Sequence, residues 1–388
     1  MGAPIAAHPR ECERWPNRLA RDEPYMDRKA LTGVEIILKH PVAHIHAIGT
    51  AVPDHEVHQA FVAWASHQLA GTREEALFRR MAARSGISRR YSILPLANDG
   101  SAVGDGGFYQ GGPTQPTSRR MQVYAREAPE LALKAIEALA RKAELGETTH
   151  LVVASCTGFV APGVDQIIAA RLGLGEHVER TLVGFMGCYA AVAALRVAHH
   201  IARAEPEARI LVVMVELSTL HLQNSAAIEP LLAMLQFADG AAAALVSAEP
   251  KGISIRDFLA TTLPDSEDLI RWTIGDTGFE MTLSGEVPAR IAHALGNTPL
   301  LPRGDEADAW AVHPGGRSIL DAVEAGLGLQ PSALDASRDV LDRYGNMSSA
   351  TLMFVLEQLM EGTPVENGVA LAFGPGVAAE GFRFRSAA

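Results

Sequence analysis

Short apolar segments alternate with longer segments of helical period along most of the chain. The short segments have the length and residue types of buried strands and lie at 150–155, 181–185, 209–216 and 241–247. The longer segments repeat apolar residues at helical spacing and lie at 127–142, 165–172 and 188–203. This alternation predicts a mixed α/β fold whose sheets are covered by helices on both faces.

The same alternation extends towards both ends of the chain. Alternating apolar and polar residues from Val42 to Pro53 predict the first strand of the core, and an arginine-rich helix is expected at 74–84. Clustered glycine and proline residues between Asn98 and Thr117 disfavour regular structure, so we expect a long surface loop near a substrate entrance there. In the second half we expect strands at 307–313 and 368–374, and helices after Ser318 and after Ser348.

The length of 388 residues is too great for one ordinary small domain, so two packed halves are expected. We place their boundary near residue 250, in the turn from Glu249 to Gly252. Residues 1–41 are rich in Arg, Glu and Pro and lack a clean period, which predicts an irregular N-terminal extension. An interface arm and a disordered tail are both consistent with that extension. The predicted divisions are 1–41, 42–250 and 251–388.

Charge and cysteine content narrow the class of protein. The 34 basic residues stand against 45 acidic ones, giving a net charge of −11, and no dense Lys/Arg stripe offsets it, so nucleic acid and anionic membranes are poor partners. The first forty residues contain no signal-peptide core and no apolar run reaches the length of a membrane span, so we expect a cytoplasmic protein. Cys12, Cys156 and Cys188 form no metal-ligand pattern, so no zinc site or disulfide scaffold is expected.

A cysteine marks the strongest local signal for chemistry. The segment 184–190 (GFMGCYA) ends an apolar strand in glycines and starts a helix at Cys188. A thiol at a helix N-terminus lies at the positive end of the helix dipole, which favours the thiolate and makes a nucleophile. The alternative is an inert buried cysteine, because free cysteine is among the most buried residue types.

Two further residues complete a possible acyl-transfer site. His313 ends a predicted strand and is followed by Pro314 and two glycines, and Asn346 precedes the helix that Ser348 or Ser349 could cap. Each alone is compatible with a purely structural role. Together with Cys188 they can hold an acyl group as a thioester and stabilise negative charge on its carbonyl oxygen or on a malonyl-derived enolate.

Four motifs resemble those of type III polyketide synthases, the chalcone synthase superfamily, in the same order and with similar spacing. They are GFMGCYAA, AVHPGG, YGNMSSAT and the terminal AFGPG. The resemblance covers the chain from Val42 to the end. It implies a thiolase-like αβαβα fold of two related halves and a homodimer, with Cys188 as nucleophile and His313 and Asn346 as the decarboxylation and oxyanion site. It implies acyl-CoA and malonyl-CoA as substrates and no metal or organic cofactor.

Other positions follow from the same resemblance. Phe237 matches an aromatic gatekeeper between the CoA tunnel and the cavity, and Met281 stands where the family usually has a second phenylalanine. Arg80 and Arg84 match residues that bind CoA phosphates, although a solvated helix face explains them equally well. The resemblance puts the cavity walls at Thr157, Ala161, Ser218 and His221. Three of these are small, which favours a medium or long fatty acyl-CoA starter, several malonyl-CoA extensions and an alkylpyrone or alkylresorcinol-like product.

Several alternatives remain open from the sequence. The same chemistry could use a small starter, malonyl-CoA or an aromatic acyl-CoA. An initiating ketoacyl synthase uses the same three residues for a single condensation. A non-catalytic scaffold member would not require all three residues, and a cysteine hydrolase fits the position of Cys188 in mid-chain less well.

Overall fold

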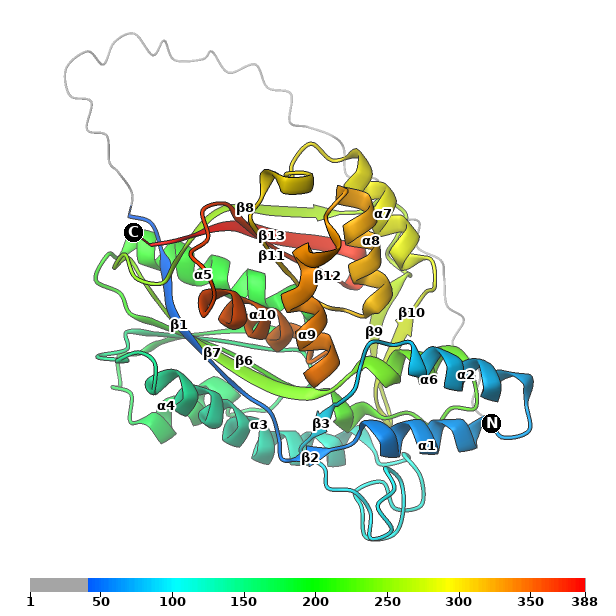
Figure 1. The fold of residues 1–388 in the computed structure, drawn as a ribbon. Coiled ribbons are helices and arrows are strands. Elements are labelled where there is room, and N and C mark those ends of the chain that lie inside the picture. Colours follow the sequence, from blue (N-terminus) through cyan, green and yellow to red (C-terminus); the bar gives the residue numbers. More distant parts are fainter. Residues whose placement is uncertain (1–40, 388) are drawn as a thin grey trace, which may run out of the picture. The chain divides into compact units, whose positions relative to one another are not determined.

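The computed structural model describes residues 41–387 (Figure 1). The predicted N-terminal extension, apart from its last residue, and Cys12 lie outside the described residues. Within 41–387, no helix is long and apolar enough to cross a membrane, and no group of three His, Cys, Asp or Glu residues could hold a metal ion.

In the described part of the chain, nine strands form one mixed sheet in the order β11-β12-β13-β8-β1-β7-β6-β4-β5 (Figure 1). The strands of the first half are β1 His44–Ala51, β4 His150–Ser155, β5 Glu179–Gly184, β6 Ile210–Leu217 and β7 Asp239–Ser247. Those of the second half are β8 Ile253–Thr262, β11 Ala309–Val312, β12 Gly368–Gly374 and β13 Ala378–Ser386. The halves meet where β1 pairs with β8 through His44 with Ser254 and Ile45 with Ile253.

The two halves repeat one topology. In the first half β4 and β6 are parallel, β6 and β7 are antiparallel, and β7 and β1 are antiparallel. In the second half β11 and β12 are parallel, β12 and β13 are antiparallel, and β13 and β8 are antiparallel. The order β4-β6-β7-β1 therefore matches β11-β12-β13-β8, which confirms the prediction of two related halves.

Helices separate and cover the two halves of the sheet. The central pair is α5 Ala190–Ala204 and α10 Thr351–Met360, which share one apolar cluster with strands of both halves. The outer helices are α3 Thr117–Ala140 and α4 Val164–Leu172 on the first half, and α7 Val287–Asn297 and α8 Arg317–Leu327 on the second. This arrangement gives five layers, α-β-α-β-α, and is the thiolase-like fold (Figure 1).

The residue pattern of single strands explains these layers. In β6, Ile210, Val212 and Met214 face the central helices, whereas the alternate residues Leu211 and Val213 face α3. Successive side chains of a strand point to opposite faces, so an uninterrupted apolar strand requires a helix layer on each side. Alanines fill the sheet-facing side of α5, and their small side chains let this good helix former pack closely between the two halves.

The remaining elements lie at one end of the layers, near the site described below. They are helices α1 His58–Gln68, α2 Arg73–Ala83 and α6 Ile228–Gln236, the short pair β2 His55–Glu56 and β3 Tyr91–Ser92, and the hairpin β9 Ile270–Gly275 with β10 Gly278–Leu283. Helix α9 Asp335–Tyr344 instead packs against α8, α10 and β11. The predicted loop at 98–117 has no regular structure up to the start of α3.

Several predicted helix starts are wrong. The helix expected from position 127 begins at Thr117 and continues through Pro129. The helices expected from Cys188 and after Ser348 each begin with a 3₁₀ turn, Gly187–Tyr189 and Ser348–Ala350, before the α-helix starts. Those tight turns place polar groups of both segments at the N-terminal ends of the central helices.

Candidate active site

A cavity of about 570 Å³ lies where the N-terminal ends of the central helices meet the ends of the strands. Cys188, His313 and Asn346 all line it, together with the segment Gly374–Gly376. We call it the catalytic cavity. The structure therefore brings the three predicted catalytic residues of the two halves around one space.

Cys188 lies on a strained turn between β5 and α5. Phe185 has a φ of 56°, a left-handed conformation that is unfavourable for a residue with a side chain. Gly187 has a φ of 74°, and a Cβ atom there would lie 2.3 Å from Cδ of Pro375. The glycine is thus required both by its conformation and by the close approach of the Gly374–Gly376 segment.

The environment of Cys188 disfavours its ionised form. Burial raises the pKa of Cys188 to about 12, the nearby Glu216 carboxylate adds to this, and side-chain hydrogen bonds from Ser348 and Asn346 oppose it. Burial therefore outweighs the helix-terminus effect on which the sequence interpretation relied. Cys188 is only half-buried, because one side of it faces the catalytic cavity. Protein atoms surround its other sides.

His313 follows β11 and presents an imidazole without partners. Its backbone N–H donates to the carbonyl oxygen of Leu371 at 2.8 Å, while neither ring nitrogen has a hydrogen-bond partner among the described residues. Burial lowers the pKa of His313 to about 3, so the free imidazole is neutral. A proton passed from Cys188 to His313 would create opposite charges in one cavity, and each would then stabilise the other.

Asn346 is held in one orientation by short local contacts. Its Oδ1 accepts from the backbone N–H of Ser348 at 2.8 Å, and its Nδ2 donates to the carbonyl oxygen of Gly315 at 3.2 Å. An amide nitrogen carries two hydrogens, so one remains for a ligand in the catalytic cavity. Asn346 also pairs through its backbone with the segment around Phe237, since its carbonyl oxygen accepts from the N–H of Ala238.

Glu216 was not singled out by sequence reasoning. It is fully buried at the end of β6 and accepts hydrogen bonds from the backbone N–H of Cys156 and the hydroxyl of Thr157, both at 2.9 Å, and from the hydroxyl of Ser349. Burial raises the pKa of Glu216 to about 7 against these contacts. Glu216 is the single acidic residue in the apolar segment ILVVMVEL. Because buried carboxylates are rare, this position could have indicated a functional residue from the sequence alone.

A second cavity, of about 90 Å³, lies beside the catalytic cavity. We call it the back cavity. Four residues line both cavities and form what we call the dividing wall, namely Ala233, Phe237, Trp272 and Met281. The two predicted gatekeepers, Phe237 and Met281, thus lie at a boundary between two spaces, and Trp272 lies there with them.

The four predicted cavity-wall residues divide into two pairs. Ser218 and His221 line the back cavity. Thr157 and Ala161 line neither cavity, because the hydroxyl of the buried Thr157 is bound to Glu216 and Ala161 is exposed on a surface loop. His221 is fully hydrogen-bonded, with Nε2 at 2.8 Å from the carbonyl oxygen of Thr157 and Nδ1 accepting from the N–H of Phe279.

The predicted CoA-binding residues lie in the last turn of α2 and directly after it. Arg80 and Arg84 are both exposed, and Met81 between them lines the catalytic cavity. The backbone carbonyl oxygen of Arg84 accepts from Arg317 at 3.3 Å, which ties the end of α2 to α8. Two guanidinium groups are therefore available near this cavity for an anionic group outside it.

Comparison with known proteins assigns the family. The sequence matches the description "Chalcone and stilbene synthases, N-terminal domain" over residues 37–250 and the corresponding C-terminal domain over 255–388. With the layered fold, these matches show that the chain belongs to the chalcone and stilbene synthase family. It is a type III polyketide synthase, an acyltransferase that performs decarboxylative condensation.

Individual relatives are similar over most of their length. The chain is 36% identical over 287 residues to the alpha-pyrone synthesis polyketide synthase-like Pks18 of Mycobacterium tuberculosis, covering 68% of this chain and 72% of that protein. It is 33% identical over 372 residues to bisdemethoxycurcumin synthase of Oryza sativa subsp. japonica, covering 87% and 90%. The structure of PKS-I from the brown alga Ectocarpus siliculosus matches with a TM-score of 0.81 and 31% identity, covering 90% of this chain and 99% of that one.

Proposed function

We propose that this synthase condenses a medium- or long-chain fatty acyl-CoA starter with several malonyl-CoA units and cyclises the product to an alkylpyrone or an alkylresorcinol-like compound. The observation that carries the proposal is the single cavity lined by Cys188, His313 and Asn346, with a second, mainly apolar cavity beside it. Similarity to an alpha-pyrone synthesis protein supports the pyrone product.

In the proposed mechanism, Cys188 attacks the starter thioester. His313 accepts the thiol proton, the new carbon–sulfur bond forms, and the bond to the CoA sulfur breaks as CoA leaves with a proton returned from His313. Malonyl-CoA then loses carbon dioxide, and the N–H donors of His313 and Asn346 stabilise the resulting enolate oxygen. The enolate carbon attacks the acyl-Cys188 carbonyl, the bond to the Cys188 sulfur breaks, and the extended chain leaves as its CoA thioester. The Cys188 thiolate takes up a proton from solvent, and the extended chain can then acylate Cys188 again for the next round.

The substrate path is proposed from the cavity walls. Phe237 and Met281 act as the gate that separates CoA from the growing chain, and Arg80 and Arg84 bind CoA phosphates outside the catalytic cavity. We propose that neither a metal nor an organic cofactor takes part, because acyl transfer and enolate stabilisation are assigned to side chains.

We further propose a cytoplasmic homodimer. Strand β5 is an edge strand of the sheet, and Leu182 on this strand is 46% exposed. Phe159, on the adjoining loop, is 42% exposed. An edge strand with an exposed apolar side chain, next to an exposed phenylalanine, is a liability in a monomer and fits pairing with a second copy of the chain.

The test is product formation by the purified chain from malonyl-CoA and a series of acyl-CoA starters, read by mass spectrometry. Products with several malonyl-derived units from fatty starters are expected, with loss of products in Cys188→Ala. In His313→Gln and Asn346→Ala, malonyl-CoA decarboxylation should fall by about 10²-fold or more, the usual cost of removing an oxyanion donor. Products from small starters alone, or a single condensation, would contradict the proposal in favour of a small-starter enzyme or a ketoacyl synthase.

A further inference from the structure

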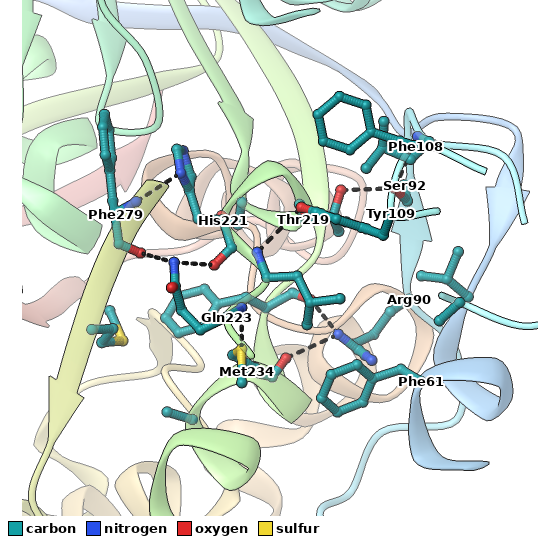
Figure 2. A pocket seen from close by; sticks show the side chains of 18 of the residues that line it. Phe61, Arg90, Ser92, Phe108, Tyr109, Thr219, His221, Gln223, Met234 and Phe279 are labelled. Atoms are coloured by element: carbon teal, nitrogen blue, oxygen red, sulfur yellow. Dashed lines mark hydrogen bonds between the residues drawn. The ribbon is translucent and has the colours of Figure 1, made fainter. Parts of the chain in front are cut away.

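Arg90 is a charged residue in the interior of the protein, where it is only 2% exposed. It directly precedes β3, and its guanidinium carbon lies 4.7 Å from the centre of the Phe61 ring. Figure 2 shows the two side chains beside each other. Burial lowers the pKa of Arg90 to about 10, so the side chain is still charged at neutral pH. A buried charge of this kind requires hydrogen bonds that offset the loss of water.

The hydrogen bonds of Arg90 connect α1 to the end of α6. Its Nε donates to Nδ1 of His58, the first residue of α1, at 3.0 Å. Its Nη1 donates to the backbone carbonyl oxygens of Met234, at 3.2 Å, and of Phe237, which directly follows α6 (Figure 2). A guanidinium group presents its donors in a rigid planar fork. Arg90 therefore fixes the carbonyl group of Phe237 relative to α1.

The backbone around Phe237 in turn holds the backbone of Asn346. The N–H of Asn346 donates to the carbonyl oxygen of Gln236 at 2.8 Å, and the N–H of Ala238 donates to the carbonyl oxygen of Asn346 at 2.9 Å. These two bonds form an isolated β-bridge that belongs to no strand. The position of the Asn346 backbone therefore depends on that of Phe237.

Arg90 also contacts the other chain segment of this bridge. Gly345, which precedes Asn346, has a φ of 71°, and a Cβ atom there would lie 2.8 Å from Cγ of Arg90 and 3.0 Å from the carbonyl oxygen of Gln236. Only a glycine allows this close approach in this conformation. One side chain thus packs against both segments that set the place of Asn346.

Stability alone does not explain an arginine at this position. Nη2 of Arg90 has no hydrogen-bond partner among the described residues. Glu56 and Asp239 favour its charge, but neither forms a direct ion pair with it in residues 41–387. Replacement of even a well-paired buried charge by apolar side chains is often neutral or stabilising. The arrangement therefore points to a requirement for geometry.

We propose that Arg90 is a positioning residue for decarboxylation, which holds the backbone of Asn346 through the carbonyl group of Phe237 and so aims the Asn346 amide at the enolate oxygen. This inference rests on the role proposed for Asn346. The amide acts on negative charge that develops in the transition state. A small displacement of Asn346 should therefore lower kcat for malonyl-CoA decarboxylation and leave KM nearly unchanged.

Arg90→Lys tests the proposal, because it keeps the charge but presents its donors from a single nitrogen. We expect kcat for malonyl-CoA decarboxylation to fall about tenfold, within the roughly 10²-fold that a misplacement of ~1 Å can cost. In an Asn346→Ala background the same substitution should lower kcat by less than about twofold, since the group that it positions is gone. Equal factors in the two backgrounds would overturn the inference.

Arg120→Lys is the matched control. Arg120 is also fully buried, and its Nη1 donates to the carbonyl oxygens of Leu220 at 2.6 Å and Leu222 at 2.9 Å rather than to the segment around Phe237. Its substitution should lower the Tm as Arg90→Lys does, but any change in decarboxylation should be the same with and without the Asn346 side chain. A dependence on Asn346 as large as that of Arg90→Lys would contradict a specific role of Arg90.

Two substitutions of His58 test the same connection with Arg90 in place. Burial and the charge of Arg90 lower the pKa of His58 to about 4, so its neutral ring accepts the hydrogen bond. His58→Leu removes this acceptor and should lower kcat for decarboxylation about threefold, whereas His58→Asn supplies a side-chain oxygen and should restore most of the rate. Equal rates in the two variants would contradict the inference even where Arg90→Lys does not fold.

The proposed function and the role of Arg90 fail in different ways. If Asn346→Ala decarboxylates malonyl-CoA as fast as the wild type, the role proposed for Asn346 is wrong and the role of Arg90 is wrong with it. If Asn346→Ala is slow but the losses of the two substitutions multiply in the double variant, the proposed function stands and the positioning role of Arg90 is wrong.

Discussion

The carboxyl group of Glu216 is the acidic group that most influences the surroundings of Cys188. Its contacts come from Cys156, Thr157 and Ser349, three residues that adjoin the catalytic turns of both halves. Burial is the main cause that raises the pKa of Cys156 and that of Cys188, and the charge of Glu216 adds to it for both, so a charged Glu216 makes either thiol harder to ionise. A neutral Glu216 therefore favours the chemistry proposed for Cys188.

The charge state of Glu216 should be visible in stability. Burial raises its pKa from 4.5 to about 7, so its stabilising contribution is present below about pH 4.5 and is lost as the pH rises through 7. Glu216→Gln removes the charge, so the Tm of the variant minus that of the wild type should increase from pH 5 to pH 8, on the order of 2 °C. Thermal unfolding followed by circular dichroism measures this, with the exposed Glu229→Gln as a control for buffer effects. A difference that does not vary with pH would show that Glu216 does not titrate in this window.

At the scale of elements, the C-terminal end of α2 carries the proposed CoA-binding residues. Arg80 lies in its last turn and Arg84 directly follows it, on either side of Met81, whereas Arg79 forms an ion pair with Glu75 one turn earlier at 3.2 Å. Arg79, which is paired within the helix, is therefore a matched control for Arg80 and Arg84, which are proposed to bind CoA.

We expect Arg80→Ala and Arg84→Ala each to raise the KM for acyl-CoA by about fivefold, because each removes an exposed charge that attracts phosphate. The KM for the same acyl group on N-acetylcysteamine, which lacks phosphates, should not change, and neither should the KM values of Arg79→Ala. Steady-state kinetics at low and high salt measure the effect, which should shrink at high salt. Equal effects on both thioesters would instead indicate a structural role of α2.

The elements also show what the sequence could predict. Strand β4 has the predicted bounds, because HLVVAS is buried on both faces and its apolar run has no competing period. The hairpin β9–β10 was not predicted, because it packs outside the main sheet, so few of its residues are buried and its sequence has no apolar run like that of β4. Motifs identified Cys188, His313 and Asn346, whereas the position of Trp272 depends on long-range packing that a local pattern does not contain.

At the scale of the whole molecule, the two halves depend on each other for the site. Cys188 comes from the first half, and His313 and Asn346 come from the second. The sheet joins the halves through few residue pairs between β1 and β8, while the apolar cluster around α5 and α10 joins them over a much larger set of buried residues. The free energy of burial in that central layer therefore fixes the geometry of the site.

Assembly of the whole molecule is testable at β5. Leu182→Lys places a charge on the exposed edge strand, which should convert a dimer to a monomer, since lysine on an edge strand opposes pairing. Leu300→Lys, at a position that is 61% exposed and far from β5 in the chain, should leave the dimer intact. Light scattering coupled to size-exclusion chromatography measures the mass of each. A wild-type monomer, or a Leu182→Lys dimer, would contradict pairing through this strand.

The hairpin β9–β10 stands apart from the nine-stranded sheet that holds the catalytic turns. It nevertheless carries Trp272 and Met281, two of the four residues that divide the cavities. Under the proposed function, substrate selection and catalysis therefore depend on separate parts of the chain. We therefore expect substitutions in the hairpin β9–β10 to change the range of products while the catalytic turns stay the same. A library of hairpin variants is the natural starting point for engineering the product of this enzyme.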